Sequence, residues 1–255
     1  MNLLLEIEKT KLILDYTIFS SSKPYIVVGI PAFNEEKTIS NVIFTAQNFA
    51  DAIIVCDDGS MDQTTQVAKC SGADVIKHKR NRGYGAAIGS LFKRARRLNA
   101  DVLVTIDSDG QHDPKEIPNI VKPIVEGVAD MVIGSRFINA NGTVEMPLYR
   151  RFGAKLITKL VNGSSNNGIH DSQSGFRAYN REALKHLQIS ESGMGASVEI
   201  LFKAHAHNLK ICEVPSYCKY PYGMSTSTKN PITHGISIII YIARFIVKKT
   251  LLKFT

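Results

Sequence analysis

The most informative stretch of the sequence is Val102–Pro114, which reads VLVTIDSDGQHDP. Its first five residues are mostly apolar and β-branched, a pattern typical of a strand that is buried on both faces. Asp107 and Asp109 follow, and because side chains alternate along an extended chain, both carboxylates project to the same side where the strand ends. Such a pair can hold a divalent cation whose other sites remain for water and phosphate oxygens. The alternative is an ordinary polar turn, since Asp, Ser and Gly favour turns.

Apolar runs of this kind alternate with amphipathic helical patterns along the chain. Strands are expected at 25–30, 52–56, 74–76, 102–106 and 130–133, and helices after about 34, after about 63, and at about 86–98, 115–125 and 196–207. Asn34 is the expected N-cap of the first of these helices, and Ser60 with Gln63 matches a capping box before the second. The alternation with short connections predicts an α/β fold, a mostly parallel sheet with helices on both faces.

Polar side chains cluster where the predicted strands end. They follow the first, second and fourth strands: Asn34 and Glu35, Asp57 and Asp58, Asp107 and Asp109. Open α/β sheets bind ligands at the carboxyl ends of their strands. Any one of these turns could be a helix cap, but three on one sheet edge favour a ligand site.

The charge of the chain indicates an anionic partner. Lysine and arginine exceed the acidic residues and give a formal net charge of +8, which suits nucleic acid, a phosphorylated small molecule or a lipid surface. Nucleic acid is not favoured, because no aromatic residues are interleaved with the basic runs 77–82 and 93–97 as a stacking surface requires. The four cysteines show no C-x-x-C spacing, so neither a zinc site nor a redox pair is indicated, and a reducing, cytoplasmic setting is the simplest interpretation.

A dinucleotide-binding oxidoreductase is also not favoured. The glycines at 83, 85 and 89 have the spacing G-x-G-x-x-x-G, which differs by one residue from the dinucleotide fingerprint and follows the third predicted strand instead of the first.

Neither end of the sequence predicts a transmembrane helix. The N-terminal residues 1–16 contain Glu6 and Glu8 and resemble a short amphipathic helix more than a signal peptide. The most apolar segment, Gly235–Val247, contains Arg244 and is shorter than the roughly 20 residues that a spanning helix needs. Residues 235–255 instead predict a basic amphipathic C-terminal helix, which either lies on an anionic membrane surface or packs on protein.

The order of the motifs resembles the family 2 inverting glycosyltransferases, and within them the dolichyl-phosphate (polyprenyl-phosphate) mannosyl- and glucosyltransferases. The resemblance covers about residues 25–215 and rests on these motifs: Pro31-Ala32-Phe33-Asn34-Glu35, Asp57-Asp58-Gly59-Ser60, Asn81-x-Gly83-x-Gly85, Asp107-Ser108-Asp109-Gly110-Gln111-His112-x-Pro114, Gly134-Ser135-Arg136 and Asp171-x-x-Ser174-Gly175-Phe176.

The resemblance implies a GT-A fold, with one glycosyltransferase domain over residues 1–255, a catalytic core at about 24–215 and an acceptor- and membrane-proximal tail at about 216–255. It also implies a set of site residues: Pro31, Phe33, Glu35, Asp58 and Asp107 for the sugar nucleotide, Asp107, Asp109 and Gln111 for Mg²⁺ or Mn²⁺, and Asp109, Arg136 and Arg150 as catalytic residues, with the two arginines facing the acceptor phosphate. Phe33 stands where the family often has Tyr, and Tyr220 stands where many mannosyl members have Arg, which leaves the donor sugar open.

The implied activity is metal-dependent transfer of a hexose, with inversion, from a nucleotide sugar of the GDP-mannose or UDP-glucose type to a polyprenyl phosphate. The acceptor phosphate is ionised at neutral pH and needs no general base, and an arginine can grip it with two hydrogen bonds. The alternative is a saccharide or other hydroxyl acceptor, for which Asp171 or Glu199 is the candidate base. The expected partners therefore include the membrane surface, with a peripheral cytoplasmic location, and self-association into a homo-oligomer stays open.

Overall fold

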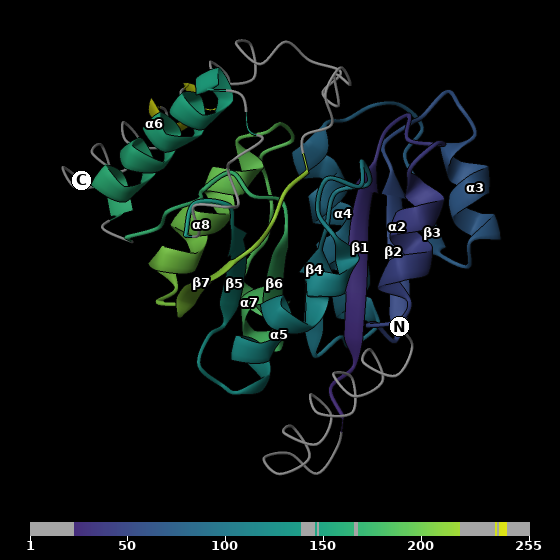
Figure 1. The fold of residues 1–255 in the computed structure, drawn as a ribbon, viewed down its shortest axis with the longest axis horizontal. Coiled ribbons are helices and arrows are strands. Elements are labelled where there is room, and N and C mark those ends of the chain that lie inside the picture. Colours follow the sequence, from purple (N-terminus) through teal and green to yellow (C-terminus); the bar gives the residue numbers. More distant parts are fainter. Residues whose placement is uncertain are drawn as a thin grey trace.

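The computed structural model describes residues 23–138, 146, 148–165, 168–219, 238 and 240–243, without the side chains of residues 149, 150, 164 and 165. A seven-stranded sheet forms its centre, with the strands in the order β3-β2-β1-β4-β6-β5-β7 (Figure 1). The strands are β1 (Ile26–Ala32), β2 (Ala52–Asp57), β3 (Asp74–Lys77), β4 (Val102–Thr105), β5 (Met131–Ser135), β6 (Arg177–Asn180) and β7 (Ile211–Pro215). The helices are α2 (Ile39–Ala46), α3 (Thr64–Cys70), α4 (Tyr84–Arg97), the 3₁₀ helix η1 (Pro114–Glu116), α5 (Ile117–Val125), α6 (Leu148–Ser165), α7 (Arg181–His186) and α8 (Ala196–Ala206).

The sheet is mostly parallel, as the sequence predicted. β1 pairs in parallel with β2 and β4, β2 with β3, and β5 with β7. β6 is the exception, because it lies between β4 and β5 and runs antiparallel to both. The carboxyl ends of β1, β2 and β4 therefore meet at one edge of the sheet.

Two hydrophobic clusters cover the two faces of the sheet, because alternate residues of each strand point to opposite sides. In β1, Val27 belongs to the cluster that includes residues of α4, α7 and α8, whereas Ile26, Val28 and Ile30 belong to the cluster that includes residues of α2, α3 and α5. The helices thus lie on both faces, which confirms the predicted α/β layering (Figure 1).

The beginnings of the first two helices differ from the predictions. Asn34 is not an N-cap: its backbone is left-handed, with φ of 57°, and α2 starts only at Ile39. Ser60 and Gln63 do not form a capping box either, since α3 has no side-chain cap. Instead, the Ser60 hydroxyl accepts a hydrogen bond from the Asn34 backbone N–H at 2.9 Å. These polar residues join the two loops to each other and do not cap the helices.

The C-terminal segment packs on the domain where the structure describes it. Ile238 and residues 240–243 are helical, and Ile238 and Ile242 are buried in the same cluster as α4 and α8. Ile240 remains 45% exposed. The rest of the predicted C-terminal helix, the N-terminal residues 1–22 and Tyr220 lie outside the described residues. Among the residues that are described, no helix is both apolar and long enough to cross a bilayer.

Candidate active site

The sheet edge brings together the acidic residues that follow β1 and β4. The charge of Asp109 contributes to raising the pKa of Glu35, after burial, and the charge of Glu35 in turn contributes to raising the pKa of Asp107. These effects require the carboxylates to lie close to one another. The prediction that residues distant in sequence share one site is therefore consistent with the geometry.

Asp107 and Asp109 occupy the turn where β4 ends. Both are half-buried, and Gly110 follows in the left-handed conformation with φ of 72°. The Gln111 backbone N–H donates to Asp109 Oδ1 at 3.0 Å, which closes the turn. Burial raises the pKa of Asp107, and the negative charge of Asp109 raises it further.

Gly175, in the segment just before β6, lies directly against the Asp107 carboxylate. A Cβ added at Gly175 would lie 2.5 Å from Asp107 Oδ2, so only glycine leaves room for the carboxylate in this position. The Thr105 hydroxyl donates to the Gly175 carbonyl at 2.9 Å and fixes this approach. The sequence motif contained Gly175, but its role as the neighbour of Asp107 becomes visible only in the structure.

The donor set at Asp107, Asp109 and Gln111 fits a divalent cation such as Mg²⁺ or Mn²⁺. Hard oxygen ligands suit these ions. Burial raises the pKa of Asp107 most, and the neighbouring charge of Asp109 raises it further, so a cation would stabilise the ionised form of Asp107. No group of three or more His, Cys, Asp or Glu side chains in the described residues could hold a metal by itself. The arrangement therefore suits an ion that also takes ligands from a bound phosphate or from water.

The end of β1 and the segment after it contain the residues predicted to bind a nucleotide. The sequence predicted that β1 would end before Pro31, but the strand continues through Pro31 to Ala32. At Pro31, β1 pairs with β2 alone, because its pairing with β4 ends at Gly29. Phe33 and Glu35 are half-buried at this edge, and Glu35 Oε2 accepts a hydrogen bond from the Thr38 hydroxyl at 2.8 Å. The direct contact of these residues with a nucleotide stays a prediction.

Asp58 is buried and hydrogen-bonded to the loop before α4. Its carboxylate accepts hydrogen bonds from the backbone N–H of Arg82, at 3.0 Å, and of Gly83, at 2.7 Å. His78 Nδ1 lies 2.6 Å from Asp58 Oδ1, and His78 Nε2 lies 2.9 Å from the Ser90 hydroxyl. Asp58 thus holds the loop that leads into α4, and the predicted contact with base or ribose remains untested. His78 was not predicted, because nothing in its local sequence distinguishes it from the basic run around it.

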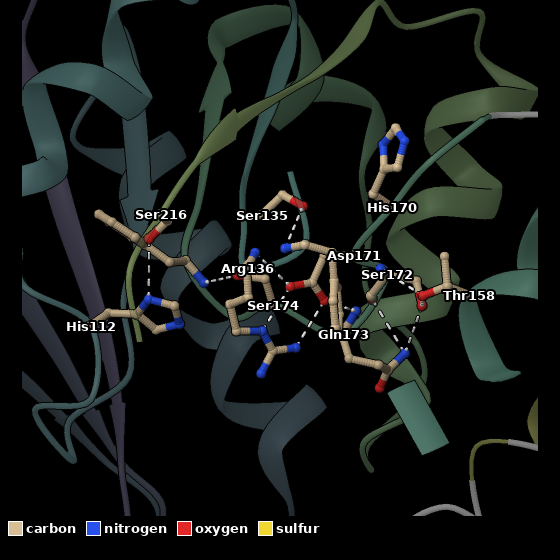
Figure 2. Close-up of polar contacts among 12 residues, drawn as sticks. His112, Ser135, Arg136, Thr158, His170, Asp171, Ser172, Gln173, Ser174 and Ser216 are labelled. Carbon is tan, nitrogen blue, oxygen red and sulfur yellow. Dashed lines mark hydrogen bonds and ion pairs between the residues drawn. The ribbon is translucent and has the colours of Figure 1, made fainter. Parts of the chain in front are cut away.

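Arg136 and Asp171 form a buried ion pair at the end of β5 (Figure 2). Arg136 Nε donates to Asp171 Oδ2 at 2.7 Å, and Nη2 donates to Oδ1 at 2.8 Å. Asp171 is fully buried, and although burial raises its pKa, the charge and hydrogen bonds of Arg136 lower the pKa overall. The positive charge of Arg136 also lowers the pKa of Asp107, so this cation lies near the carboxylate pair.

Glu213 in β7 fixes the loop that carries Asp171. Its Oε1 accepts from the Asp171 backbone N–H at 2.8 Å, and its Oε2 accepts from the His170 backbone N–H at 2.8 Å. Glu213 could not be identified from the sequence, because its partners lie more than 40 residues away. Arg150 is part of α6, but its side chain lies outside the described residues, so its predicted role stays a prediction.

His112 is buried just after the turn that carries the carboxylate pair. Its Nδ1 lies 3.4 Å from the Ser216 hydroxyl (Figure 2), which donates to Glu116 at 2.6 Å. Burial, followed by the charge of Arg136, lowers the pKa of His112 to about 4, so the ring is neutral at pH 7. The His112 ring also packs against Phe176, with the two ring centres 5.3 Å apart.

The two carboxylates considered as general bases are both engaged in the structure. Asp171 belongs to the ion pair with Arg136. Glu199 is 1% exposed and accepts hydrogen bonds from the backbone N–H groups of Ser190 and Glu191 and from Lys203. Burial raises the pKa of Glu199, but the hydrogen bonds from Lys203 and Ser190 lower it overall. A general base must be able to take a proton from its substrate, so neither residue favours the hydroxyl-acceptor alternative.

Comparisons with known proteins give a consistent family. The model of glycosyl transferase family 2 matches residues 27–188. The chain is 37% identical to the UDP-N-acetylglucosamine–dolichyl-phosphate N-acetylglucosaminyltransferase of Methanococcus voltae, over 80% of this chain and 89% of that protein. It is 32% identical to the dolichyl-phosphate hexose transferase of Haloferax volcanii, over 74% of this chain and 81% of that protein.

The solved structures show the same fold at lower sequence identity. Glucosyl-3-phosphoglycerate synthase of Mycobacterium tuberculosis, in complex with UDP, superimposes with a TM-score of 0.71 at 22% identity, over 90% of this chain and 82% of that one. This likeness confirms the layered architecture derived from the sheet order.

Proposed function

The chain belongs to glycosyl transferase family 2, and from this membership we propose that it transfers a sugar, with inversion, from a nucleotide sugar to a polyprenyl phosphate at a membrane surface. One observation carries the proposal: the Asp107 carboxylate lies close enough to both the Asp109 carboxylate and the Arg136 cation for their charges to shift its pKa. In this proposal the diphosphate of the donor would bind at the carboxylate pair, and Arg136 would receive the second phosphate. The names of the Methanococcus voltae and Haloferax volcanii relatives, both dolichyl-phosphate transferases, support the same acceptor class.

In the proposed reaction, the bond between the anomeric carbon and the diphosphate breaks as an acceptor phosphate oxygen forms a bond on the opposite face. The nucleoside diphosphate leaves with the electron pair, and no proton has to move because the acceptor phosphate is already ionised. A divalent cation, when bound, would neutralise the charge that develops on the leaving diphosphate. Asp107 and Asp109, with Gln111, would hold that cation.

The remaining proposed roles belong to the residues that would orient the acceptor phosphate and hold the nucleotide. Arg136 and Arg150 would orient the acceptor phosphate in line with the anomeric carbon, and Asp171 fixes the guanidinium plane of Arg136 through two hydrogen bonds. Pro31, Phe33 and Glu35 would contact the nucleotide. Asp58 would support the donor pocket through the loop that it holds.

The donor sugar is the finer part of the proposal. The Methanococcus voltae relative is named for an N-acetylglucosaminyl donor and the Haloferax volcanii relative for a hexose. A panel of radiolabelled UDP-N-acetylglucosamine, UDP-glucose and GDP-mannose with a polyprenyl phosphate and Mn²⁺ identifies the donor. Product that extracts into organic solvent and is labile to mild acid supports the lipid-phosphate acceptor, whereas label that stays in water as a disaccharide contradicts it.

The metal-binding role is tested by substitution at Asp109. Asp109→Asn keeps the size of the side chain but removes one charge from the ligand pair, so metal-dependent turnover should fall by about 100-fold or more. The thermal unfolding profile should remain close to that of the wild type, because Asp109 lies in a half-buried turn. Turnover close to that of the wild type would remove the carboxylate pair from the mechanism.

A further inference from the structure

Helix α6 has one face on the domain and one face away from it. On the inner face, Ile157 and Val161 are buried in the cluster that contains α4 and α8. The Thr158 hydroxyl lies 2.9 Å from the Ser172 hydroxyl, which ties the helix to the loop of Asp171. Beyond this attachment, α6 projects at the periphery of the molecule (Figure 1).

The outer face carries large apolar side chains in a regular row. Leu148, Phe152 and Leu156 are 80%, 73% and 43% exposed, and Leu160, one turn further, is 38% exposed. A spacing of four residues places successive side chains on nearly the same side of a helix. Other exposed large apolar side chains, such as Phe44 and Val128, are scattered over other elements. Single exposed apolar residues are common on soluble proteins, but a contiguous row marks an interaction surface.

Basic side chains form a second row beside the apolar one. Arg151, Lys155 and Lys159 each precede an apolar residue of the row by one position and are exposed. Successive residues are 100° apart around a helix, so each basic residue lies beside the apolar residue that follows it. Because the residues of both rows are exposed, the two rows share the outer face. An apolar row flanked by lysine and arginine is typical of a helix that lies in the plane of an anionic membrane surface.

The two rows lie next to the candidate acceptor site. Lys155 Nζ is 5.9 Å from the centre of the Phe137 ring, and Arg136 Cζ is 5.8 Å from the same centre on the chain before it. Lys155 of the basic row and Arg136 of the ion pair with Asp171 therefore lie near the same aromatic ring. A membrane in contact with α6 would hold its phosphate headgroups near the height of Arg136.

We propose that the outer face of α6, formed by Leu148, Phe152, Leu156, Arg151, Lys155 and Lys159, binds the protein to an anionic lipid membrane. The helix lies in the interface, with the apolar row among the acyl chains and the basic row among the headgroups. The inference deepens the proposed function and rests on it only for the identity of the acceptor that this surface reaches. It assigns the contact to α6, whereas Ile238 and Ile242 of the C-terminal segment face the core.

The test measures cosedimentation with phosphatidylcholine vesicles, prepared with and without phosphatidylglycerol. The apolar variant is Leu148→Ser with Phe152→Ser, and its matched control is Phe44→Ser with Val128→Ser, which removes exposed apolar side chains elsewhere. The charge variant is Lys155→Glu with Lys159→Glu, and its control is Lys69→Glu with Lys93→Glu. Circular dichroism melting shows that each protein is folded.

The wild type and both controls should bind vesicles that contain phosphatidylglycerol, and added salt should weaken this binding. Each α6 variant should bind them at least about tenfold more weakly. Binding by the α6 variants equal to that of the controls would overturn the proposal. A change from dimer to monomer in light scattering, with vesicle binding unchanged, would instead assign the face to a second copy of the chain and overturn it as well.

Activity assays separate this inference from the proposed function. With a short, water-soluble prenyl phosphate and no vesicles, the α6 variants should transfer sugar as fast as the wild type. With a long polyprenyl phosphate in vesicles, they should be slower by the same factor as their loss of binding. If the wild type transfers no sugar to either acceptor, the proposed function fails while the vesicle experiment still decides the membrane contact.

Discussion

The ion pair between Arg136 and Asp171 gives the sharpest prediction, because its geometry defines both a stability and an activity effect. Asp171 is fully buried and accepts three hydrogen bonds from Arg136 and one from the Gln173 backbone N–H. Asp171→Asn keeps the shape of the side chain but removes its charge and one acceptor oxygen. Removing one partner of a buried pair costs about 3–5 kcal/mol. Since the Arg136 side chain is 15% exposed and keeps some contact with water, we expect a value near the lower end, about 3 kcal/mol.

That loss should be visible in thermal unfolding. For a chain of this size, about 3 kcal/mol lowers the melting temperature by about 6–12 °C. A double-mutant cycle with Arg136→Gln isolates the pair, and the coupling between the two substitutions should be about 2 kcal/mol or more. Calorimetry or circular dichroism gives the four stabilities that the cycle needs.

The same variant should affect the acceptor and not the donor. With its partner neutral, the guanidinium of Arg136 is no longer held in one plane, and a hydrogen bond to a charged group is worth about 1.5–3 kcal/mol. We therefore expect kcat/KM for the polyprenyl phosphate to fall by about tenfold to 100-fold, with KM for the nucleotide sugar unchanged. A coupling energy below about 0.5 kcal/mol, or an equal rise in both KM values, would refute the reasoning.

The pair also sets the direction of a pH effect. The pKa of Asp171 is lower in the folded protein than in the unfolded chain, so its contribution to stability is present at neutral pH. The contribution is lost as pH falls below the unfolded pKa and through the folded one. The wild type should therefore lose stability more steeply than Asp171→Asn in acid, as followed by denaturant unfolding across the acid range.

Three further predictions concern Gly175, His78 and His112. Gly175→Ala should displace the Asp107 carboxylate, raise the Mn²⁺ concentration needed for half-maximal activity by about tenfold, and leave KM for the acceptor unchanged; an unchanged Mn²⁺ requirement would contradict this. His78→Phe should loosen the loop held by Asp58 and raise KM for the donor several-fold more than it changes kcat, whereas a loss of kcat alone would argue against this role. His112 has a folded pKa of about 4, below its unfolded value, so the wild type should lose about 2 kcal/mol of stability between pH 7 and pH 5. His112→Gln should remove that loss, and equal slopes for the two proteins in urea titrations would show that another group titrates.

The sequence was sufficient for the features that depend on neighbouring residues. The strand at 102–106 and its two carboxylates follow from local apolar patterning and alternation, and both appear at the end of β4. The helices that cover the sheet follow from local apolar periodicity, and Ile39, Val42, Ile43 and Ala46 are the buried residues of α2. These features need no knowledge of which distant segments come together.

The pairings between distant segments could not be predicted from the sequence. Asp171 was considered as a base, but its partner Arg136 lies 35 residues earlier and pairs with it only because β5 and the loop before β6 meet. Likewise, Asn34 and Ser60 were expected to cap separate helices, and they bond to each other because β1 and β2 are adjacent. Side chains that favour caps also favour loop-to-loop hydrogen bonds, so local propensity cannot distinguish the two.

The direction of the pKa shifts distinguishes carboxylates that support the structure from those suited to chemistry. Asp171 and Glu199 have lowered pKa values because the protein's own donors stabilise their charge, so each has little to gain from a ligand. Glu35 and Asp107 have raised pKa values, because burial and neighbouring carboxylates oppose their charge. A divalent cation removes that opposition, so the protein's own electrostatics favour the ion at Asp107 and Asp109. A cation bound at Asp171 or Glu199 would instead have to displace an arginine or a lysine that is already in place.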